Sequence, residues 1–207
     1  MVKKIILGFG IFATLLFGAT LQDGLNAFEK GDYKTAFTIF EDLASKGDIE
    51  AQYNLGLMYK NAYGVKQDYK EAIKYYKKAS DQGFAKAHNN LAYMYYNGLG
   101  VKQDYFRAKE LYTKSANQGD KDGQFNLGVI YNSGTGTKQN YTEAKKWYQK
   151  AVAQGDVNSQ YNLGVMYAKG EGVKQDKKIA KEWFGKACDG GDQMGCENYK
   201  ILNQQGY

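Results

Sequence analysis

The chain repeats itself every 36 residues, and this period limits its possible folds more than any other feature. One repeated segment reads YNLGLMY at residues 53–59, and related segments follow in register at 89–95, 125–131 and 161–167. A second segment, GVKQDY at 64–69, returns at 100–105, 136–141 and 172–177. Fixed periods of about 20 to 50 residues are typical of solenoids, in which each unit buries its apolar face against the next unit. Binding is therefore the first functional expectation.

Apolar residues recur at helical spacing in two stretches of each repeat. In the first full repeat they are Ala51, Leu55, Met58 and Tyr59, and then Ala72, Tyr75, Tyr76 and Ala79. Both patterns are typical of amphipathic helices, so each repeat is predicted to be an antiparallel helix pair. The predicted fold class is all-α, an α/α superhelical solenoid. Its helix pairs are expected at about 21–46, 51–82, 87–118, 123–154 and 159–190, with a C-terminal capping helix at 195–203.

Short polar residues and glycines mark the expected helix ends. The predicted N-caps of the second helices, whose side chains accept from free backbone N–H groups, are Asp68, Asp104, Asn140 and Asp176. Glu71 and Glu143 follow two of these caps by three residues, which is the spacing of a capping box. The glycines expected to close helices in the left-handed conformation are Gly83, Gly119 and Gly155.

The N-terminus has the pattern of an export signal. Lys3 and Lys4 precede an apolar run at 5–17, and small residues follow at 18–20. A run of thirteen residues is too short to cross a bilayer comfortably, so cleavage is favoured over an uncleaved anchor. We therefore predict a signal peptide at 1–19, a solenoid at 20–207, and a periplasmic or secreted protein with no stable membrane insertion after cleavage.

Charge and composition bound the class of partner. The net charge is +6, and the lysines are interspersed with acidic residues rather than gathered into one run. This pattern favours a solvated outer face over a nucleic-acid footprint, so no nucleic-acid partner is expected. Hydrophobic residues make up 43% of the chain and aromatic residues 15%, enough to fill the contacts between neighbouring helices.

The repeated pattern resembles the Sel-one-like repeat family, a variant of the tetratricopeptide fold with a longer loop between its helices. The residues that carry the resemblance are Ala51 with YNLG at 53–56 and Tyr59, the GV and Asp68 of the loop, and Ala72, Tyr75, Tyr76 and Ala79. The resemblance covers about residues 21–203. It implies a concave surface lined by the first helix of each pair. It also implies a role as an adaptor that binds peptides, proteins or sometimes glycans. It does not identify the ligand.

A cysteine pair resembles a secreted, cysteine-rich subgroup of that family. Ala187-Cys188 and Gly195-Cys196 match the subgroup's motif once, while the other repeats lack the pair. Two cysteines in an exported chain suggest one structural disulfide, between Cys188 and Cys196, and a redox or metal role is the less favoured alternative. The resemblance to this subgroup also implies a β-lactam-related activity, because proteins of the subgroup are described as penicillin-binding or weakly β-lactamase-like.

His88 and a recurring asparagine are the main polar candidates for a site. His88 is the sole histidine and takes the repeat position of Gln52, Gln124 and Gln160, which favours a surface or interface residue over a general base. The recurring asparagines are Asn54, Asn90, Asn126, Asn162 and Asn198. Two interpretations stay open: each amide ties helices together or bonds a backbone carbonyl, or the asparagines line a groove and hold an extended peptide.

The functional expectation is an exported adaptor that binds a protein or peptide in its concave groove. Variable groove positions, among them Tyr93 and Tyr96, would then set specificity. No catalytic set, metal site or cofactor motif assembles from the sequence, so no cofactor is expected and an enzymatic role is disfavoured. The alternatives are a β-lactamase-like or penicillin-binding activity and a purely architectural role in the envelope.

Overall fold

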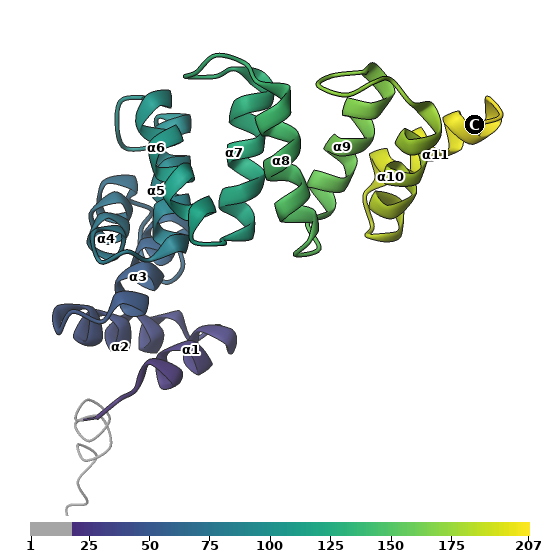
Figure 1. Cartoon of the computed structure of the whole chain (residues 1–207). Helices are drawn as coiled ribbons and strands as arrows, with labels where there is room; N and C mark the ends of the chain where they lie inside the picture. Colours follow the sequence, from purple (N-terminus) through teal and green to yellow (C-terminus); the bar gives the residue numbers. More distant parts are fainter. Residues whose placement is uncertain (1–17) are drawn as a thin grey trace, which may run out of the picture. The chain divides into compact units, whose positions relative to one another are not determined.

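The computed structural model describes residues 18–207, and all regular structure in that part of the chain is helical (Figure 1). The helices are α1 (Leu21–Glu29), α2 (Tyr33–Ser45), α3 (Ile49–Asn61), α4 (Tyr69–Asp81), α5 (Ala85–Asn97), α6 (Tyr105–Asn117), α7 (Lys121–Ser133), α8 (Tyr141–Val152), α9 (Val157–Lys169), α10 (Lys177–Asp189) and α11 (Gln193–Gln204). The predicted all-α class is confirmed. The predicted signal peptide falls almost entirely on residues 1–17, which lie outside the described part.

The chain divides into two units, and within each unit consecutive helices pack together. The first unit ends at Gln82 and holds α1 to α4, while the second, Gly83–Tyr207, holds α5 to α11. The helix pairs α3/α4, α5/α6, α7/α8 and α9/α10 are those predicted from the period. That residues 20–207 form one continuous solenoid stays a prediction. Within the described residues, no helix combines the length and apolar character needed to cross a membrane.

All four predicted N-caps are confirmed, since each side chain accepts from a backbone N–H in the first turn of its helix. The first helices of the pairs begin two residues earlier than predicted, at 49, 85, 121 and 157. The cause is a second set of caps that the sequence reasoning missed, namely Asp48, Asp120, Asp156 and Asp192. A Gly-Asp pair precedes each of these helices, and this pattern could have predicted the caps from the sequence. Phe84 replaces the aspartate before α5 and makes no side-chain cap.

The predicted capping boxes at Glu71 and Glu143 are wrong. The Glu71 carboxylate instead accepts from Lys74 Nζ at 2.8 Å, and Glu143 pairs with Lys146 Nζ at 3.5 Å. The N-cap backbone N–H groups are also already used, because those of Asp68 and Asn140 donate to the Tyr59 and Tyr131 carbonyls at 3.0 and 2.8 Å. A reciprocal box does form at the start of α1, where Thr20 and Asp23 bond each other's backbone N–H groups.

Most of the repeated loop sequence has a structural task. In the first loop, Gln67 Nε2 donates to the Lys60 carbonyl at 2.9 Å and the Asp68 backbone N–H donates to the Tyr59 carbonyl at 3.0 Å. Gln103, Gln139 and Gln175 make the equivalent side-chain bond at 2.7 to 2.8 Å. These bonds close the loop onto the last turn of the preceding helix.

The loop glycine packs against the preceding repeat. Gly136 has a φ of +68°, and a Cβ there would lie 2.6 Å from Cβ of Tyr105 at the start of α6. Gly172 meets Tyr141 at 2.5 Å in the same way. Glycine is therefore required both by the backbone conformation and by the close approach. The contact also places successive loops of the second unit side by side.

The recurring Leu-Gly pair of the first helices is explained by the core. Leu55 is fully buried, and a Cβ on Gly56 would lie 2.5 Å from the ring of Tyr76 on α4. Gly128 and Gly164 meet Tyr148 and Phe184 at 2.6 and 2.7 Å. The missing side chain lets an aromatic ring of the second helix lie directly on the backbone of the first. Large and small residues thus interlock across each helix pair, as close packing requires.

Candidate functional site

The junction between successive repeats holds a buried glutamine. Gln124 on α7 is 6% exposed, its Nε2 donates to the Ala116 carbonyl of α6 at 3.4 Å, and its Oε1 accepts from Gln154 Nε2 at 2.9 Å. Gln52 makes the same two contacts in the first unit, with Ala44 and Gln82. His88 takes this repeat position on α5 and is 5% exposed. The position is thus a buried one in the packing between repeats rather than part of an open face.

The cysteine pair occupies this same junction at the end of the chain. Cys188 on α10 and Cys196 on α11 form the predicted disulfide, across a separation of eight residues. Cys188 is the repeat equivalent of Ala116 and Cys196 that of Gln124. The covalent bond therefore replaces the glutamine-to-carbonyl hydrogen bond found in the earlier junctions, and it ties α11 to α10.

One junction lacks its bridge. The repeat equivalent of Gln154 is Gly190, which has no side chain to reach Gln160 on α9. Gln160 Oε1 is accordingly buried without a hydrogen-bond partner. This acceptor is a local weakness, because a buried polar atom without a partner costs free energy.

The recurring asparagines are half-buried and bond mostly within the protein. Asn54 and Asn90 donate from Nδ2 to the carbonyls of Glu50 and Lys86, one turn earlier in their own helices. Asn126 on α7 instead donates to Asn89 Oδ1 on α5 at 2.9 Å, which links two first helices. Asn198 reaches Met194 at 3.0 Å and Tyr161 at 3.5 Å, and Asn162 is half-buried on α9. Each of these bonds matches the structural interpretation, while the groove interpretation stays a prediction.

The open face of α5 differs from that of the other first helices. Tyr93 is 41% exposed, while the residues at the equivalent positions on α3, α7 and α9 are Leu57, Val129 and Val165, all half-buried. Tyr93 lies one turn after Asn90 on the same helix face. Tyr96 is half-buried, and its ring centroid lies 5.1 Å from that of Tyr105. Tyr93 is therefore the predicted groove residue that offers the largest accessible aromatic surface.

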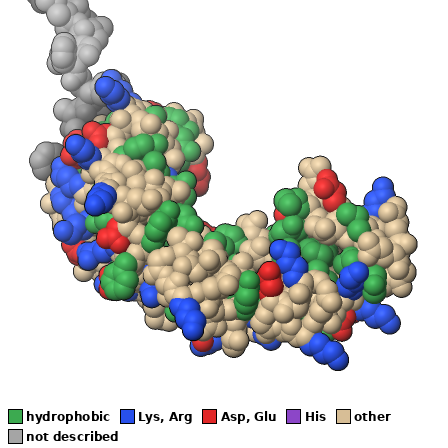
Figure 2. Space-filling model, turned by 90° about the horizontal axis from the view of Figure 1, so that it is seen from above, with side chains coloured by type: hydrophobic (Ala, Val, Ile, Leu, Met, Phe, Trp, Pro, Cys, Tyr) green, Lys and Arg blue, Asp and Glu red, His purple; other side chains and the backbone are tan. Residues whose placement is uncertain are grey.

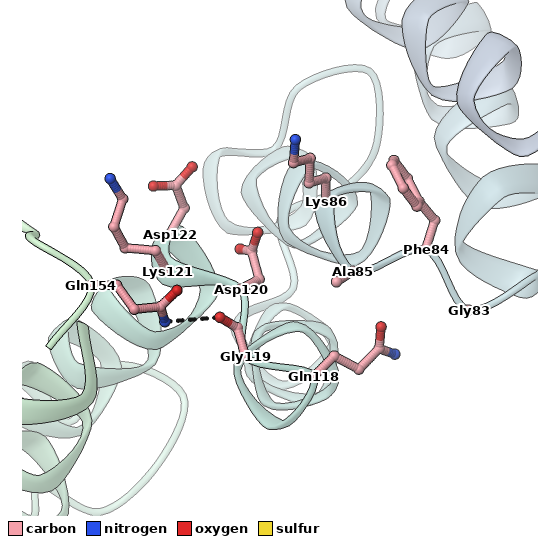
Figure 3. Close-up of a pocket in the computed structure, with 10 residues that line it drawn as sticks. All are labelled: Gly83, Phe84, Ala85, Lys86, Gln118, Gly119, Asp120, Lys121, Asp122 and Gln154. Carbon is pink, nitrogen blue, oxygen red and sulfur yellow. Dashed lines mark hydrogen bonds between the residues drawn. The ribbon is translucent and has the colours of Figure 1, made fainter.

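A recess of about 560 Å³ lies where α5 and α7 begin (Figure 3). Its lining comprises residues 83–86, 118–122 and 154. Gln154 Nε2 donates to the Gly119 carbonyl at 2.9 Å along one wall. Partial burial raises the pKa of the Asp122 carboxyl above its usual value, and the nearby charge of Asp120 raises it further. Sequence reasoning missed this recess, because its charged residues have the pattern of an ordinary solvated surface.

The described residues contain no group of three or more His, Cys, Asp or Glu side chains placed to hold a metal ion.

The family model of the Sel1 repeat matches four successive segments, at residues 49–84, 85–120, 121–156 and 157–192. The chain belongs to the Sel1 repeat family. These segments coincide with the helix pairs α3/α4, α5/α6, α7/α8 and α9/α10. Sel1 repeats are in general scaffolds for protein interactions, and this coarse function applies to the chain.

Two solved Sel1-type structures are similar along most of the chain. The protective antigen c5321 of uropathogenic Escherichia coli, which displays an SLR fold, is 33% identical with a TM-score of 0.80, over 91% of this chain and 45% of its own. A Sel1 repeat protein of Oxalobacter formigenes is 30% identical with a TM-score of 0.77, over 85% of this chain and 72% of its own. This Sel1 chain thus spans less than half the length of c5321.

A putative Sel1 repeat protein of Klebsiella pneumoniae has a TM-score of 0.59 at 24% identity, over 88% of this chain and 91% of its own, and supports the fold alone. No match to this Sel1 chain was found among the curated proteins.

Proposed function

We propose that this Sel1 repeat protein is an exported adaptor that binds a protein or peptide on the open face of α5 and α7. The observation that carries the proposal is Tyr93, which leaves 41% of its surface exposed on a helix where its equivalents are aliphatic and half-buried. Tyrosine offers a large, rigid apolar surface with a polar tip, and it is enriched in protein interfaces.

The side-chain amides of Asn89 and Asn126, beside Tyr93, could hydrogen-bond the backbone of an extended peptide. The Asn126 to Asn89 hydrogen bond uses one donor and one acceptor of the pair. Each amide side chain has two N–H donors and an acceptor oxygen with two lone pairs, so the pair keeps hydrogen-bonding capacity for a peptide backbone. An aromatic anchor flanked by amide groups would therefore provide both apolar contact and main-chain recognition.

Export is proposed on two grounds. The N-terminal pattern of Lys3, Lys4 and the apolar run at 5–17 has the features of a secretory signal. The Cys188–Cys196 disulfide supports an oxidising compartment, where such bonds persist. The proposed location is the periplasm or the extracellular space.

The test is affinity capture from envelope extracts, using the wild-type chain and a Tyr93→Val, Asn126→Ala double variant. Tyr93→Val installs the residue found at 129 and 165, so the fold should tolerate it. A partner bound by this face should be lost from the variant while the circular dichroism spectrum stays helical. The matched control is Tyr199→Val on α11, where a tyrosine 40% exposed is removed from another surface. Equal capture by the double variant and the wild type would contradict the proposal.

The β-lactam alternative is not favoured by any observation on the described residues. His88, the sole histidine, is 5% exposed and would have to leave its buried position to act as a base on a bound substrate. A chromogenic cephalosporin assay on the purified protein tests the alternative, and turnover that follows the protein through purification would revive it.

A further inference from the structure

The lysine of the repeated loop has no structural task in the second unit. The glycine, glutamine and N-cap of each loop make the contacts described above, whereas Lys102, Lys138 and Lys174 are exposed. The side-chain ion pairs found among residues 18–207 involve none of these three lysines. A residue that returns with the period but does not pack is a candidate for an interaction outside the chain.

These lysines lie along one edge of the second unit. We define the loop edge as residues 100–107, 136–143 and 172–179, the three loops with the first turns of α6, α8 and α10. Gly136 packs on Tyr105, and Gly172 packs on Tyr141, so each loop lies against the start of the preceding second helix. The loops before α8 and α10 are seen at the top of Figure 1. Figure 2 looks down from that side and shows Lys and Arg side chains among exposed hydrophobic ones.

The loop edge is more basic than the opposite edge of the same unit. It carries six Lys or Arg and three acidic residues. Two of the acidic side chains, Asp104 and Asp176, already accept from backbone N–H groups as N-caps. The third, Glu143, pairs with Lys146. The opposite edge, taken as 114–122, 150–158 and 186–194, carries four basic and five acidic residues. The loop edge thus has more basic than acidic residues, whereas the opposite edge has more acidic than basic ones.

An exposed aromatic ring lies on the same edge. Phe106, in the first turn of α6, is 61% exposed, more than any other large hydrophobic residue of the described part. Its equivalents in the neighbouring repeats are the polar residues Thr142 and Lys178. Lys109 Nζ lies 5.7 Å from the Phe106 ring centroid and 3.3 Å from Thr137 Oγ1 of the next loop. The ring is therefore part of the row of loops rather than separate from it.

We propose that the loop edge of the second unit docks on an anionic lipid surface. Lys102, Lys138 and Lys174 face the phosphate groups, and Phe106 enters the headgroup region. Basic side chains near an anionic leaflet each strengthen binding about fivefold, and an aromatic ring adds apolar contact at the interface. The apolar component distinguishes this surface from one that recognises charge alone, and thus favours lipid over a soluble polyanion. The surface is separate from the face of α5 and α7 proposed for the peptide.

The test is co-sedimentation of the full chain with phosphatidylcholine vesicles, with and without phosphatidylglycerol. The measured quantity is the ratio of the two partition coefficients. Every variant carries the same residues 1–17, so changes in this ratio report the substituted edge. The Lys102→Gln, Lys138→Gln, Lys174→Gln variant should have a ratio about 100-fold lower than wild type, because each of the three lysines contributes about fivefold. Phe106→Thr, which installs the residue found at 142, should reduce the partition coefficient into phosphatidylglycerol vesicles several-fold.

The matched control is Lys86→Gln, Lys114→Gln, Lys121→Gln, which removes the same charge from the opposite side of the unit. Its ratio should stay within about threefold of wild type, because the substituted lysines would lie away from the lipid surface. An equal loss in both triple variants would show a net-charge effect and overturn the proposal. So would a wild-type ratio near one, an unchanged ratio in the loop-edge variant, or binding to soluble polyphosphate without binding to the vesicles.

Discussion

The repeat provides a matched pair of glutamines for measuring what a junction contributes to stability. Gln124 and Gln160 occupy equivalent positions on α7 and α9, but only Gln124 has both its donor and its acceptor bonded. Truncating each to alanine removes the same atoms from two different hydrogen-bonding environments.

Gln124→Ala should lower the free energy of unfolding by about 2 to 3 kcal/mol. The variant loses the bonds to the Ala116 carbonyl and to Gln154 Nε2, at about 1 kcal/mol each. It also loses roughly one buried methylene group, at about 0.8 kcal/mol. Gln160→Ala removes a buried acceptor that has no partner, which relieves a penalty of about 1 to 3 kcal/mol and offsets the lost packing. Its stability should therefore change by less than about 1 kcal/mol.

The assay is thermal and urea unfolding of both variants, followed by circular dichroism at 222 nm, a wavelength that reports helix. The expected separation of about 2 kcal/mol corresponds to roughly 6 to 8 °C in Tm for a unit of this size. Equal losses in the two variants, or a larger loss for Gln160→Ala, would refute the argument that Gly190 leaves the Gln160 side chain without its bridge.

Three further perturbations follow from the described contacts. Gly136→Ala should lower the free energy of unfolding in urea by at least about 2 kcal/mol, since the φ of Gly136 is +68° and the new Cβ would lie 2.6 Å from Tyr105. The control Gly119→Ala, at a φ of +86° but with open space around the new Cβ, should lower it by only about 1 kcal/mol. Removing the disulfide in a Cys188→Ala, Cys196→Ala variant should lower the free energy of opening of α11, measured by hydrogen exchange, by about 2.5 kcal/mol, because the disulfide no longer restricts an eight-residue loop in the unfolded chain. Unchanged protection of the α11 amides would contradict this. Asp122→Asn should raise Tm at neutral pH, because an acid whose pKa is raised on folding destabilises the native state while it is charged. The difference in Tm from wild type should disappear as pH falls through that pKa. A difference that stays constant with pH would contradict the raised pKa of Asp122.

The elements that repeat could be predicted from the sequence, because their causes are local and return with the period. Helical spacing located every helix pair, and a short polar residue before the second helix of each of the four full repeats identified its cap. The starts of the first helices were missed, since Asp120 and its equivalents were not considered as caps. The capping box at Glu71 does not form because the Asp68 backbone N–H already donates to the Tyr59 carbonyl of the preceding helix, a contact that sequence spacing does not reveal.

Contacts between repeats were harder to predict than contacts within one. The sequence showed that His88 replaces a glutamine, but the role of that glutamine depends on Gln154 and Ala116, which come from other helices. The disulfide was predicted from two cysteines in a chain with an export signal, whereas its equivalence to the glutamine junction could be recognised only from the packed helices. The recess beside Asp122 left no sequence signal, because ordinary surface residues from three segments form it.

A departure of one repeat from the others is a second guide to function, because packing explains most of the residues that the repeats share. The helix pair α5/α6 has two such departures, Tyr93 in place of an aliphatic residue and Phe106 in place of a polar one. Both rings are exposed, at 41% and 61%, although neither exposure is needed by the fold. The exposed part of each ring adds no hydrophobic stabilisation to the isolated chain, because that apolar surface stays in water. The two rings lie on different surfaces of the pair, one on the first helix and one beside the loop edge, so the peptide and lipid proposals can fail independently.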